Sequence, residues 1–480
     1  MPLTPEIPQT LELRDYQKEA VNDWLRVKGR GVFAMATGTG KTLTALVAAT
    51  QVALSCAEQN RPLLVLVIVP LRDLVEQWRR DAEWFRFRPA ICHGNMSSKN
   101  KQDLKSAFSA ARSTYGKRTE MVITTAGSLT PVGGKSHQEH FMQRQLSRHT
   151  GSLLVIGDEM HSLGTEPRLA ALPDAPTYTL GLSATPKRHQ DDEGTEALIN
   201  YFGSPVISIN IKDAIYKYDA LVEYDYFPHK IPLTPEESER YRAISARIAA
   251  AFAAGDEERA KNDIRARTRL TQHAANKSVQ LRSLMQNGLR NQTHQIIYVA
   301  EGKSPGTELQ QLEETETMLR DEFGMRVERY YGETESTQRE ALQQRLANGD
   351  IHALLAMKCL DEGVDIPSAR IGVITTSTQN PRQFVQRRGR ILRKDPVNPK
   401  SHAIIHDFIV VPPRGDSEPV KSEKTLVGAE LGRAAELADA ARNRESLFSI
   451  IDWAYDFSLS PDEFPWMSLT GSTEMEEWTS

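Results

Sequence analysis

Short apolar runs alternate with longer mixed stretches over the first 205 residues. The runs have strand length and are rich in Val, Ile and Leu, which is typical of strands buried on both faces of a parallel sheet. Five strands are expected, at residues 31–35, 63–69, 121–125, 153–156 and 178–182. The stretches between them are long enough for helices that cover both faces. The pattern predicts an α/β lobe over residues 1–205.

The same pattern returns in residues 293–412 and predicts a second lobe of the same kind. Strands are expected here at residues 295–299, 353–356, 371–375 and 403–411. Strands that alternate with helical stretches favour a parallel sheet again. The expected fold class is therefore α/β, with two parallel-sheet lobes.

Two helical regions complete the predicted organisation. Residues 206–292 form a linker and a helical insertion, because Thr234-Pro235-Glu236-Glu237 has the capping hydroxyl, proline and acids of a helix start. The Ala- and Arg-rich sequence that follows predicts a pair of helices with a break near Ala254-Gly255-Asp256. Residues 413–480 form a C-terminal segment, which is expected to be helical from about Thr425 to Asp456.

Composition is that of a soluble globular protein, with 39% hydrophobic and 25% charged residues among 480. The longest apolar run has strand length, and the N-terminus lacks the pattern of a signal peptide. The three cysteines form no CxxC pair. These features predict a cytoplasmic protein without a membrane partner. The net charge is −4, but residues 414–480 hold fourteen acids and six bases, so the rest is mildly basic, which is compatible with a nucleic-acid partner.

The strongest local signal is a glycine-rich loop, Met35-Ala36-Thr37-Gly38-Thr39-Gly40-Lys41-Thr42. It follows a predicted strand and precedes an apolar helix, as a phosphate-binding loop does. Gly38 and Gly40 would let backbone amides, including those of Thr37 and Thr39, turn toward phosphate oxygens. Lys41 would reach the β- and γ-phosphates of ATP, and the Thr42 hydroxyl would hold Mg²⁺. Met35 departs from the strict pattern, and a simple glycine-rich turn is the alternative interpretation.

A second signal is the pair of acids that ends the strand at residues 153–156. At the carboxyl edge of a parallel sheet, Asp158 would coordinate Mg²⁺ directly or through water. Glu159 would then polarise the water that attacks the γ-phosphate. A polar turn after a buried strand is the alternative interpretation.

Residues 11–411 resemble superfamily 2 helicases and translocases, which have two RecA-like lobes. Arg14-Asp15-Tyr16-Gln17 resembles the adenine-reading motif, in which Gln17 would bond the base edge and Arg14 would stack on it. The further motifs follow in the family's order: the phosphate loop, Val69–Trp78 as motif Ia, Asp158-Glu159-Met160-His161 as a DExH box, Ser183-Ala184-Thr185 as motif III, Asp361–Pro367 as motif V and Gln386–Arg393 as motif VI. The resemblance implies coupling roles for His161, Ser183 and Thr185, and nucleotide contacts for Gly363 and Asp365.

Motif VI supplies positive charge that phosphoryl transfer needs against the γ-phosphate. Arg390 and Arg393 are three residues apart, so on a helix they would share one face. The resemblance implies that they are arginine fingers delivered from the second lobe, with Gln386 orienting the water. A basic, solvated helix face is the alternative interpretation.

The resemblance also implies contacts to a sugar-phosphate backbone. The implied residues lie after predicted strands: Arg72, Gln77, Thr124, Thr125, Thr375 and Thr376. Thr124 and Thr375 could instead be ordinary strand formers, and Trp78 either a base-stacking or a packing residue. The insertion resembles a thumb-like element, and Arg265, Arg267 and Arg269 would grip phosphates there. A solvated helical pair is the alternative interpretation.

The wording of these motifs is most similar to XPB/UvsW-like and restriction-subunit-like DNA helicases. The resemblance therefore implies an ATP- and Mg²⁺-dependent motor that separates strands or translocates, with DNA favoured over RNA, in a bacterial defence or repair setting. An RNA helicase is the alternative within the class. A nucleotide-dependent switch or scaffold subunit is the alternative from another class, and the aromatic residues of the C-terminal segment are candidates for contacts with partner proteins.

Overall fold

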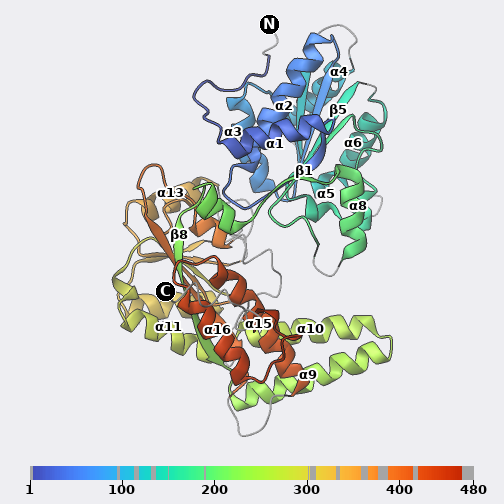
Figure 1. Ribbon diagram of the computed structural model, residues 1–480. Coiled ribbons are helices and arrows are strands. Elements are labelled where there is room, and N and C mark those ends of the chain that lie inside the picture. The colour runs from blue at the N-terminus through green and yellow to red at the C-terminus, as the bar shows by residue number, and fades with distance from the viewer. Residues whose placement is uncertain are drawn as a thin grey trace. The chain divides into compact units, whose positions relative to one another are not determined.

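The computed structural model describes residues 4–93, 98–112, 118–130, 137–149, 151–188, 191–300, 302, 310–330, 336–357, 366–376, 387–413 and 420–467. The chain divides into two compact units, and the division lies between Ala220 and Leu221. Each unit is built around its own parallel sheet with helices on both faces (Figure 1). The predicted α/β class with two parallel-sheet lobes is confirmed.

The described strands of the first unit form a seven-stranded sheet in the order β3-β4-β2-β5-β6-β1-β7, in which every pair is parallel. Their bounds are β1 Arg30–Met35, β2 Leu63–Val69, β3 Pro89–Cys92, β4 Thr119–Thr125, β5 Ser152–Gly157, β6 Tyr178–Ser183 and β7 Pro205–Ile209. The five predicted strands are present within two residues at each end. The sequence missed the two edge strands, because β3 is short and β7 is mostly half-exposed.

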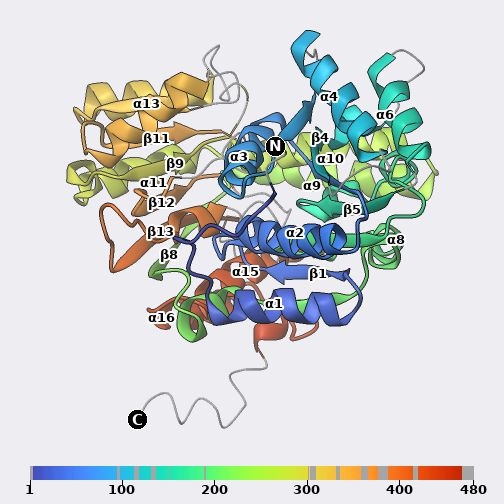
Figure 2. The same ribbon diagram turned by 90° about the horizontal axis from the view of Figure 1, so that it is seen from above.

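The helices of the first unit fill the connections between its strands. Their bounds are α1 Asp15–Arg26, α2 Lys41–Glu58, α3 Arg72–Trp84, α4 Ser98–Ala111, α5 Ala126–Leu129, α6 His137–Ser147, η1 Met160–Leu163, α7 Glu166–Leu169, α8 Asp192–Phe202 and η2 Asp213–Lys217. In Figure 2, β1 runs between α1 and α2. Since β7 pairs with β1, the first unit extends beyond the predicted boundary at residue 205.

The described strands of the second unit form a six-stranded sheet in the order β10-β11-β9-β12-β13-β8, again with parallel pairs. Their bounds are β8 Glu223–Pro232, β9 Gln295–Tyr298, β10 Val327–Tyr330, β11 Ala353–Ala356, β12 Ile371–Ile374 and β13 His402–Val411. The sequence missed β8 and β10 and assigned residues 223–232 to the linker. The reason is that β8 carries charges and Pro228, which an edge strand tolerates because one side needs no ladder donor.

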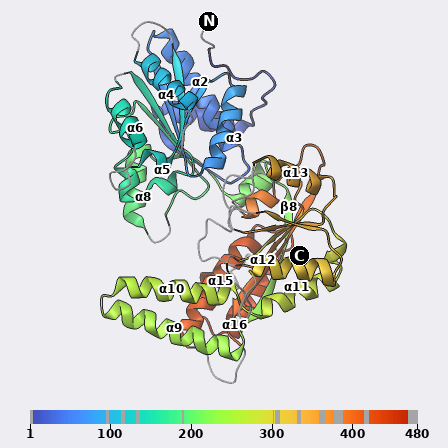
Figure 3. The same ribbon diagram turned by 180° about the vertical axis from the view of Figure 1, so that it is seen from behind.

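The predicted helical insertion is a long hairpin that projects from the second sheet (Figure 3). It consists of α9 Pro235–Ala253 and α10 Glu257–Gln272, with Gly255 at a φ of 72° between them. The predicted helix start is confirmed, because the Thr234 hydroxyl accepts from the Glu237 N–H at 3.2 Å and the Glu237 carboxylate accepts from the Thr234 N–H at 3.0 Å. A third helix, α11 Asn276–Gln286, then returns the chain to the core.

The remaining helices of the second unit include the C-terminal segment. Their bounds are η3 Leu289–Asn291, α12 Gln311–Thr317, η4 Met318–Glu322, α13 Ser336–Ala347, α15 Lys421–Asp439 and α16 Glu445–Asp456. Arg433 on α15 is buried and pairs with the buried carboxylates of Asp407 on β13 and Glu430. The Tyr224 hydroxyl on β8 donates to the Leu437 carbonyl at 2.5 Å. The C-terminal helices are thus an integral layer of the second unit. None of the described helices has the length and apolarity that crossing a membrane requires.

Candidate nucleotide site and nucleic-acid contacts

Three strands of the first sheet bring the predicted ATP-site motifs to one edge. Strands β5, β6 and β1 are consecutive and parallel, so the residues after each strand meet at their carboxyl ends. The phosphate loop follows β1, Asp158 and Glu159 follow β5, and motif III begins at Ser183, the last residue of β6. The buried apolar strands thus bring together three motifs that are far apart in the sequence.

The phosphate loop has the backbone geometry that its glycines predict. Gly38 and Gly40 have φ angles of 90° and 83°, a region that side chains rarely adopt. A Cβ on Gly40 would lie 2.5 Å from Nε2 of Gln17. That same Nε2 donates to the Thr39 carbonyl at 3.3 Å, and the Tyr16 hydroxyl donates to it at 2.9 Å. The adenine-reading motif on α1 and the phosphate loop are therefore in direct contact, and the exposed side chain of Arg14 lies beside them.

The helix that follows the loop offers the other half of an anion site. Lys41 is the first residue of α2, and its Nζ donates to the Met35 carbonyl at 3.1 Å across the loop. The first turn of α2 contains no acidic residue. Thr37 is buried, and its hydroxyl oxygen has no hydrogen-bond partner among the residues that the structure describes. Thr42, in the first turn of α2, is half-buried. A helix start without acids, a lysine and a buried hydroxyl fit the phosphates of a nucleotide.

Asp158 is held by two hydrogen bonds in a nearly closed site. Its Oδ2 accepts from the indole N–H of Trp78 at 2.8 Å, and its Oδ1 accepts from the Glu159 N–H at 3.0 Å. Burial and the neighbouring charge of Glu159 raise the pKa of Asp158 to about 6, while the Trp78 bond and the charge of Lys41 oppose that rise. The Trp78 bond and the Lys41 charge thus favour the carboxylate form of Asp158.

Glu159 has a strained backbone, and one of its carboxylate oxygens is unsatisfied among the described residues. Its φ of 44° lies in the left-handed region, which is rare for a residue with a side chain. Its Oε2 is buried, has no hydrogen bond within the described part of the chain, and lies 3.4 Å from Nδ1 of His161. That Nδ1 is also 3.0 Å from Oγ of Ser183, which accepts from the Thr185 N–H at 3.1 Å. The three residues with predicted coupling roles therefore form one chain of contacts that starts at Glu159.

Sequence reasoning missed three residues that shape this site. Tyr16 was read as part of a motif without a role, although its hydroxyl bonds the phosphate loop. Trp78 bonds Asp158, whereas the sequence offered only base stacking or packing. Arg188 donates to the carbonyl of His161 and to the Asp191 carboxylate at 2.6 Å, which braces η1 against α8. A basic residue shortly after motif III was the available signal for Arg188.

The donor set fits a hydrated Mg²⁺ ion, which prefers a carboxylate, a hydroxyl and phosphate oxygens. Asp158 and Thr42 are the protein ligands that would hold the ion. Its chemistry there would be to neutralise charge on the β- and γ-phosphates. The unsatisfied oxygens of Thr37 and Glu159 are the observations that favour polar ligands in this site.

Motif VI lies in the second unit, and its arginines have different surroundings. The helical turn ends at Ile391, and Arg393 forms a β-bridge with Leu221. The expectation that Arg390 and Arg393 share one helix face is therefore wrong. Arg390 is buried at 4% exposure, and Arg393 is half-exposed. Gln386, Gly363 and Asp365 lie outside the described residues.

The threonines predicted to contact nucleic acid are buried, and the hydroxyls of Thr124 and Thr125 are already bonded. The Thr124 hydroxyl donates to the Cys92 carbonyl at 3.0 Å, and the Thr125 hydroxyl oxygen accepts from the Ser128 N–H at 3.3 Å as the N-cap of α5. The Thr376 carbonyl accepts from Arg387. In contrast, Arg72 is exposed at the start of α3, and Gln77 is half-exposed on the same helix. The geometry favours the strand-forming interpretation of Thr124 and leaves Arg72 and Gln77 accessible.

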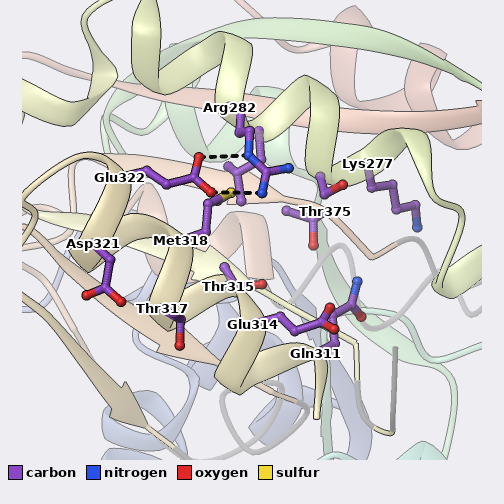
Figure 4. Close-up of a pocket in the computed structure, with 12 residues that line it drawn as sticks. Lys277, Arg282, Gln311, Glu314, Thr315, Thr317, Met318, Asp321, Glu322 and Thr375 are labelled. Carbon is purple, nitrogen blue, oxygen red and sulfur yellow. Dashed lines mark hydrogen bonds and ion pairs between the residues drawn. The ribbon is translucent and has the colours of Figure 1, made fainter. Parts of the chain in front are cut away.

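Thr375 differs from the other threonines, because it lines a hollow of about 420 Å³ between α11 and α12. Its hydroxyl donates to the Tyr298 carbonyl at 2.7 Å. Figure 4 shows the hollow, in which two hydrogen bonds join Arg282 to Glu322. Lys277 borders it as well, and burial lowers the pKa of that lysine to about 8.

The three arginines predicted on the insertion do not share one environment. Arg265 and Arg269 on α10 are exposed and one helical turn apart. Arg267 turns back toward α9, where its guanidinium lies 5.6 Å from the centre of the Tyr241 ring and 3.3 Å from Oγ of Ser245. Only Arg265 and Arg269 therefore present their charges to solvent.

Two known families match the chain. Residues 10–188 match the family described as "Type III restriction enzyme, res subunit", and residues 276–395 match "Helicase conserved C-terminal domain". The first match contains the phosphate loop and the DExH box. The second contains the described residues of motif VI. Together they match part of each sheet-containing unit, in the order that the motifs predict.

Individual relatives agree with these families. The chain is 28% identical to "DNA 3'-5' translocase XPB2" of Sulfurisphaera tokodaii over 81% of its own length and 80% of that relative. It is 23% identical to "Putative DNA 3'-5' helicase Rad25" of Haloarcula marismortui over 81% of its length and 51% of that relative. Among solved structures, "ATP-dependent Type ISP restriction-modification enzyme LlaBIII bound to DNA" shares the fold, with a TM-score of 0.58 and 17% identity over 89% of this chain and 30% of that one. In both units the chain is thus similar to superfamily 2 helicases and translocases, and it is an ATP-hydrolysing enzyme.

Proposed function

We propose that the protein is an ATP-driven motor on DNA that separates strands or translocates along the duplex. The observation that carries this proposal is the continuous path Glu159–His161–Ser183–Thr185, which joins the water-activating carboxylate to motif III. A motor needs such a path, because each hydrolysis event must change something outside the nucleotide site. The relatives are named as acting on DNA, which favours DNA over RNA.

Hydrolysis is assigned to residues of the phosphate loop and the DExH box. Lys41 and the amides at the start of α2 bind the β- and γ-phosphates, and Arg14 and Gln17 bind the adenine. Asp158 and Thr42 hold Mg²⁺, which supplies charge neutralisation when it is bound. Glu159 orients the attacking water and accepts its proton, and its open Oε2 is available for this role.

The second unit is assigned the charges that stabilise the transition state. Arg390 and Arg393 are the proposed arginine fingers, with Gln386 beside the water. Arg390 is the better supported of the two, because burial reduces the screening of its charge. Arg393 lies beyond the end of the helix that carries Arg390, so the two arginines can contribute differently to hydrolysis.

Grip on DNA is assigned to accessible polar and cationic side chains of both units. Arg72 and Gln77 on α3 and the pair Arg265 and Arg269 on α10 would contact phosphates without reading sequence. The hollow beside Thr375 is not assigned a phosphate contact, because its lining includes Glu314, Asp321 and Glu322. Protein partners stay a proposal as well, and Phe448 and Tyr455 on α16 are exposed aromatic side chains that could meet them.

The proposal is tested by the rate of ATP hydrolysis with no polymer, single-stranded DNA, duplex DNA, forked DNA and RNA, measured in parallel at one salt concentration. A DNA motor should be stimulated several-fold by at least one form of DNA and less by RNA. A rate that no DNA changes, or that only RNA raises, would contradict the proposal.

A further inference from the structure

Trp78 has an unusual hydrogen-bond partner for a buried tryptophan. A buried indole N–H needs an acceptor, and a backbone carbonyl commonly serves. Trp24 of the same unit shows that arrangement, because it is fully buried and donates to the Thr179 carbonyl at 2.9 Å. Trp78 is equally buried, but it donates at 2.8 Å to the ionisable side chain of Asp158.

This bond fixes the orientation of the Asp158 carboxylate. The other oxygen is already engaged by the Glu159 N–H, so the two bonds leave the group no free rotation. The Trp78 indole is rigid and fully buried, so packing restricts its two side-chain torsions and its N–H follows α3. The Asp158 side chain is therefore tied to the position of α3.

Helix α3 also reaches the surface. Its first residue, Arg72, is exposed, whereas Leu74, Val75 and Ala82 anchor the helix in the core. The helix packs against α2, which begins with Lys41, and against β2 and β4. A shift of α3 at its exposed end would consequently act on the carboxylate through Trp78 and on the packing of α2.

We propose that Trp78 is a positioning residue that sets Asp158 for Mg²⁺–nucleotide binding and makes α3 the route by which a DNA contact at Arg72 alters that site. The proposal deepens the proposed function and rests on it. A partner that orients a metal ligand is worth roughly 10- to 100-fold in metal affinity. Trp78 should have a similar influence here, although it touches neither the metal nor the nucleotide.

The test is equilibrium binding of a fluorescent, slowly hydrolysed ATP analogue to the full chain, with Mg²⁺ and with a chelator. Trp78→Phe keeps the ring and removes the donor. It should reduce the gain in affinity that Mg²⁺ provides roughly 10-fold or more, and leave the affinity in chelator nearly unchanged. Trp24→Phe is the matched control, because it removes an equivalent bond from an equally buried indole. It should change neither affinity, even if both variants lose thermal stability.

Two further measurements separate positioning from packing. In an Asp158→Asn background, Trp78→Phe should have little additional effect, because both changes act through one carboxylate. Addition of duplex DNA should change the affinity of the parent for the Mg²⁺–analogue complex, and Trp78→Phe and Arg72→Ala should each reduce that change.

The outcomes are distinguishable. A Mg²⁺ dependence that is equal in Trp78→Phe and the parent, or equally altered in Trp24→Phe, would overturn the positioning role. An unchanged DNA effect in Trp78→Phe would overturn the route through α3. A parent that shows no Mg²⁺-dependent nucleotide binding would overturn the proposed function together with this inference.

Discussion

Nδ1 of His161 lies 3.0 Å from Oγ of Ser183, so the DExH box and motif III are in direct contact inside the first unit. Both side chains are buried, His161 at 4% and Ser183 at 0% exposure. The contact joins the residues after β5 to the end of β6, two neighbouring strands. The contact therefore offers a buried route between the surroundings of Glu159 and a strand end.

Replacement of Ser183 should uncouple hydrolysis from movement. Ser183→Ala removes the partner of His161 and the acceptor of the Thr185 N–H, but leaves the phosphate loop and Glu159 in place. The number of base pairs opened or traversed per ATP should fall several-fold. Parallel measurement of strand displacement and phosphate release gives this ratio. Equal ratios for parent and variant would remove the coupling role.

Lys41→Ala and Glu159→Gln should both abolish turnover for different reasons. Lys41→Ala removes a charge that contacts the phosphates, so the affinity for ATP should fall. Glu159→Gln preserves the pocket and should still bind ATP, which it cannot hydrolyse because the base is lost. Nucleotide binding and steady-state hydrolysis distinguish the two variants. Hydrolysis by Glu159→Gln at the parent rate would show that Glu159 does not activate the water.

Arg390→Ala and Arg393→Ala should lower the rate of hydrolysis much more than the affinity for ATP. Arginine fingers contribute roughly 10³-fold to turnover, and this scale is expected for Arg390. Single-turnover hydrolysis and nucleotide affinity are the measurements. Parallel losses of affinity and rate in Arg390→Ala would indicate a structural or ground-state binding role instead.

The exposed arginines of α10 should control the salt dependence of DNA binding. Arg265→Ala with Arg269→Ala should weaken binding to all sequences alike. The slope of log affinity against log salt should become shallower by about 0.9 for each duplex phosphate contact that is lost. Arg267→Ala is the control on the same helix, because its guanidinium packs on Tyr241. Arg267→Ala should leave the slope unchanged. Superimposable slopes for the parent and the double variant would show that Arg265 and Arg269 do not contact DNA phosphates.

Much of the fold could be predicted, because strands buried in a parallel sheet appear in the sequence as continuous apolar runs. Leu63–Val69 is a continuous apolar run and is fully buried as β2. Strand β8 is not a continuous apolar run, because an edge strand tolerates charges and Pro228. Its partner β13 also lies 170 or more residues away, so local sequence does not reveal the pairing. Periodicity reports which faces are buried, but it does not report pairing between distant segments.

The candidate site was predicted as a set of motifs and not as a set of contacts. Local spacing identified Lys41, Asp158 and Glu159, since these follow strands directly. The bond from Trp78 to Asp158 spans 80 positions and depends on how α3 packs. Burial of Thr124 likewise became visible only when β4 was seen inside the sheet.

The central claim is that ATP hydrolysis drives movement on DNA. It is tested most directly by ATP-dependent displacement, using a third strand bound to a duplex for translocation and a forked duplex for unwinding. The parent should displace a strand from at least one of these substrates with ATP and from neither with a slowly hydrolysed analogue, and Glu159→Gln should be inactive on both. DNA-stimulated hydrolysis without displacement from either substrate would contradict the motor and would favour a nucleotide-dependent switch.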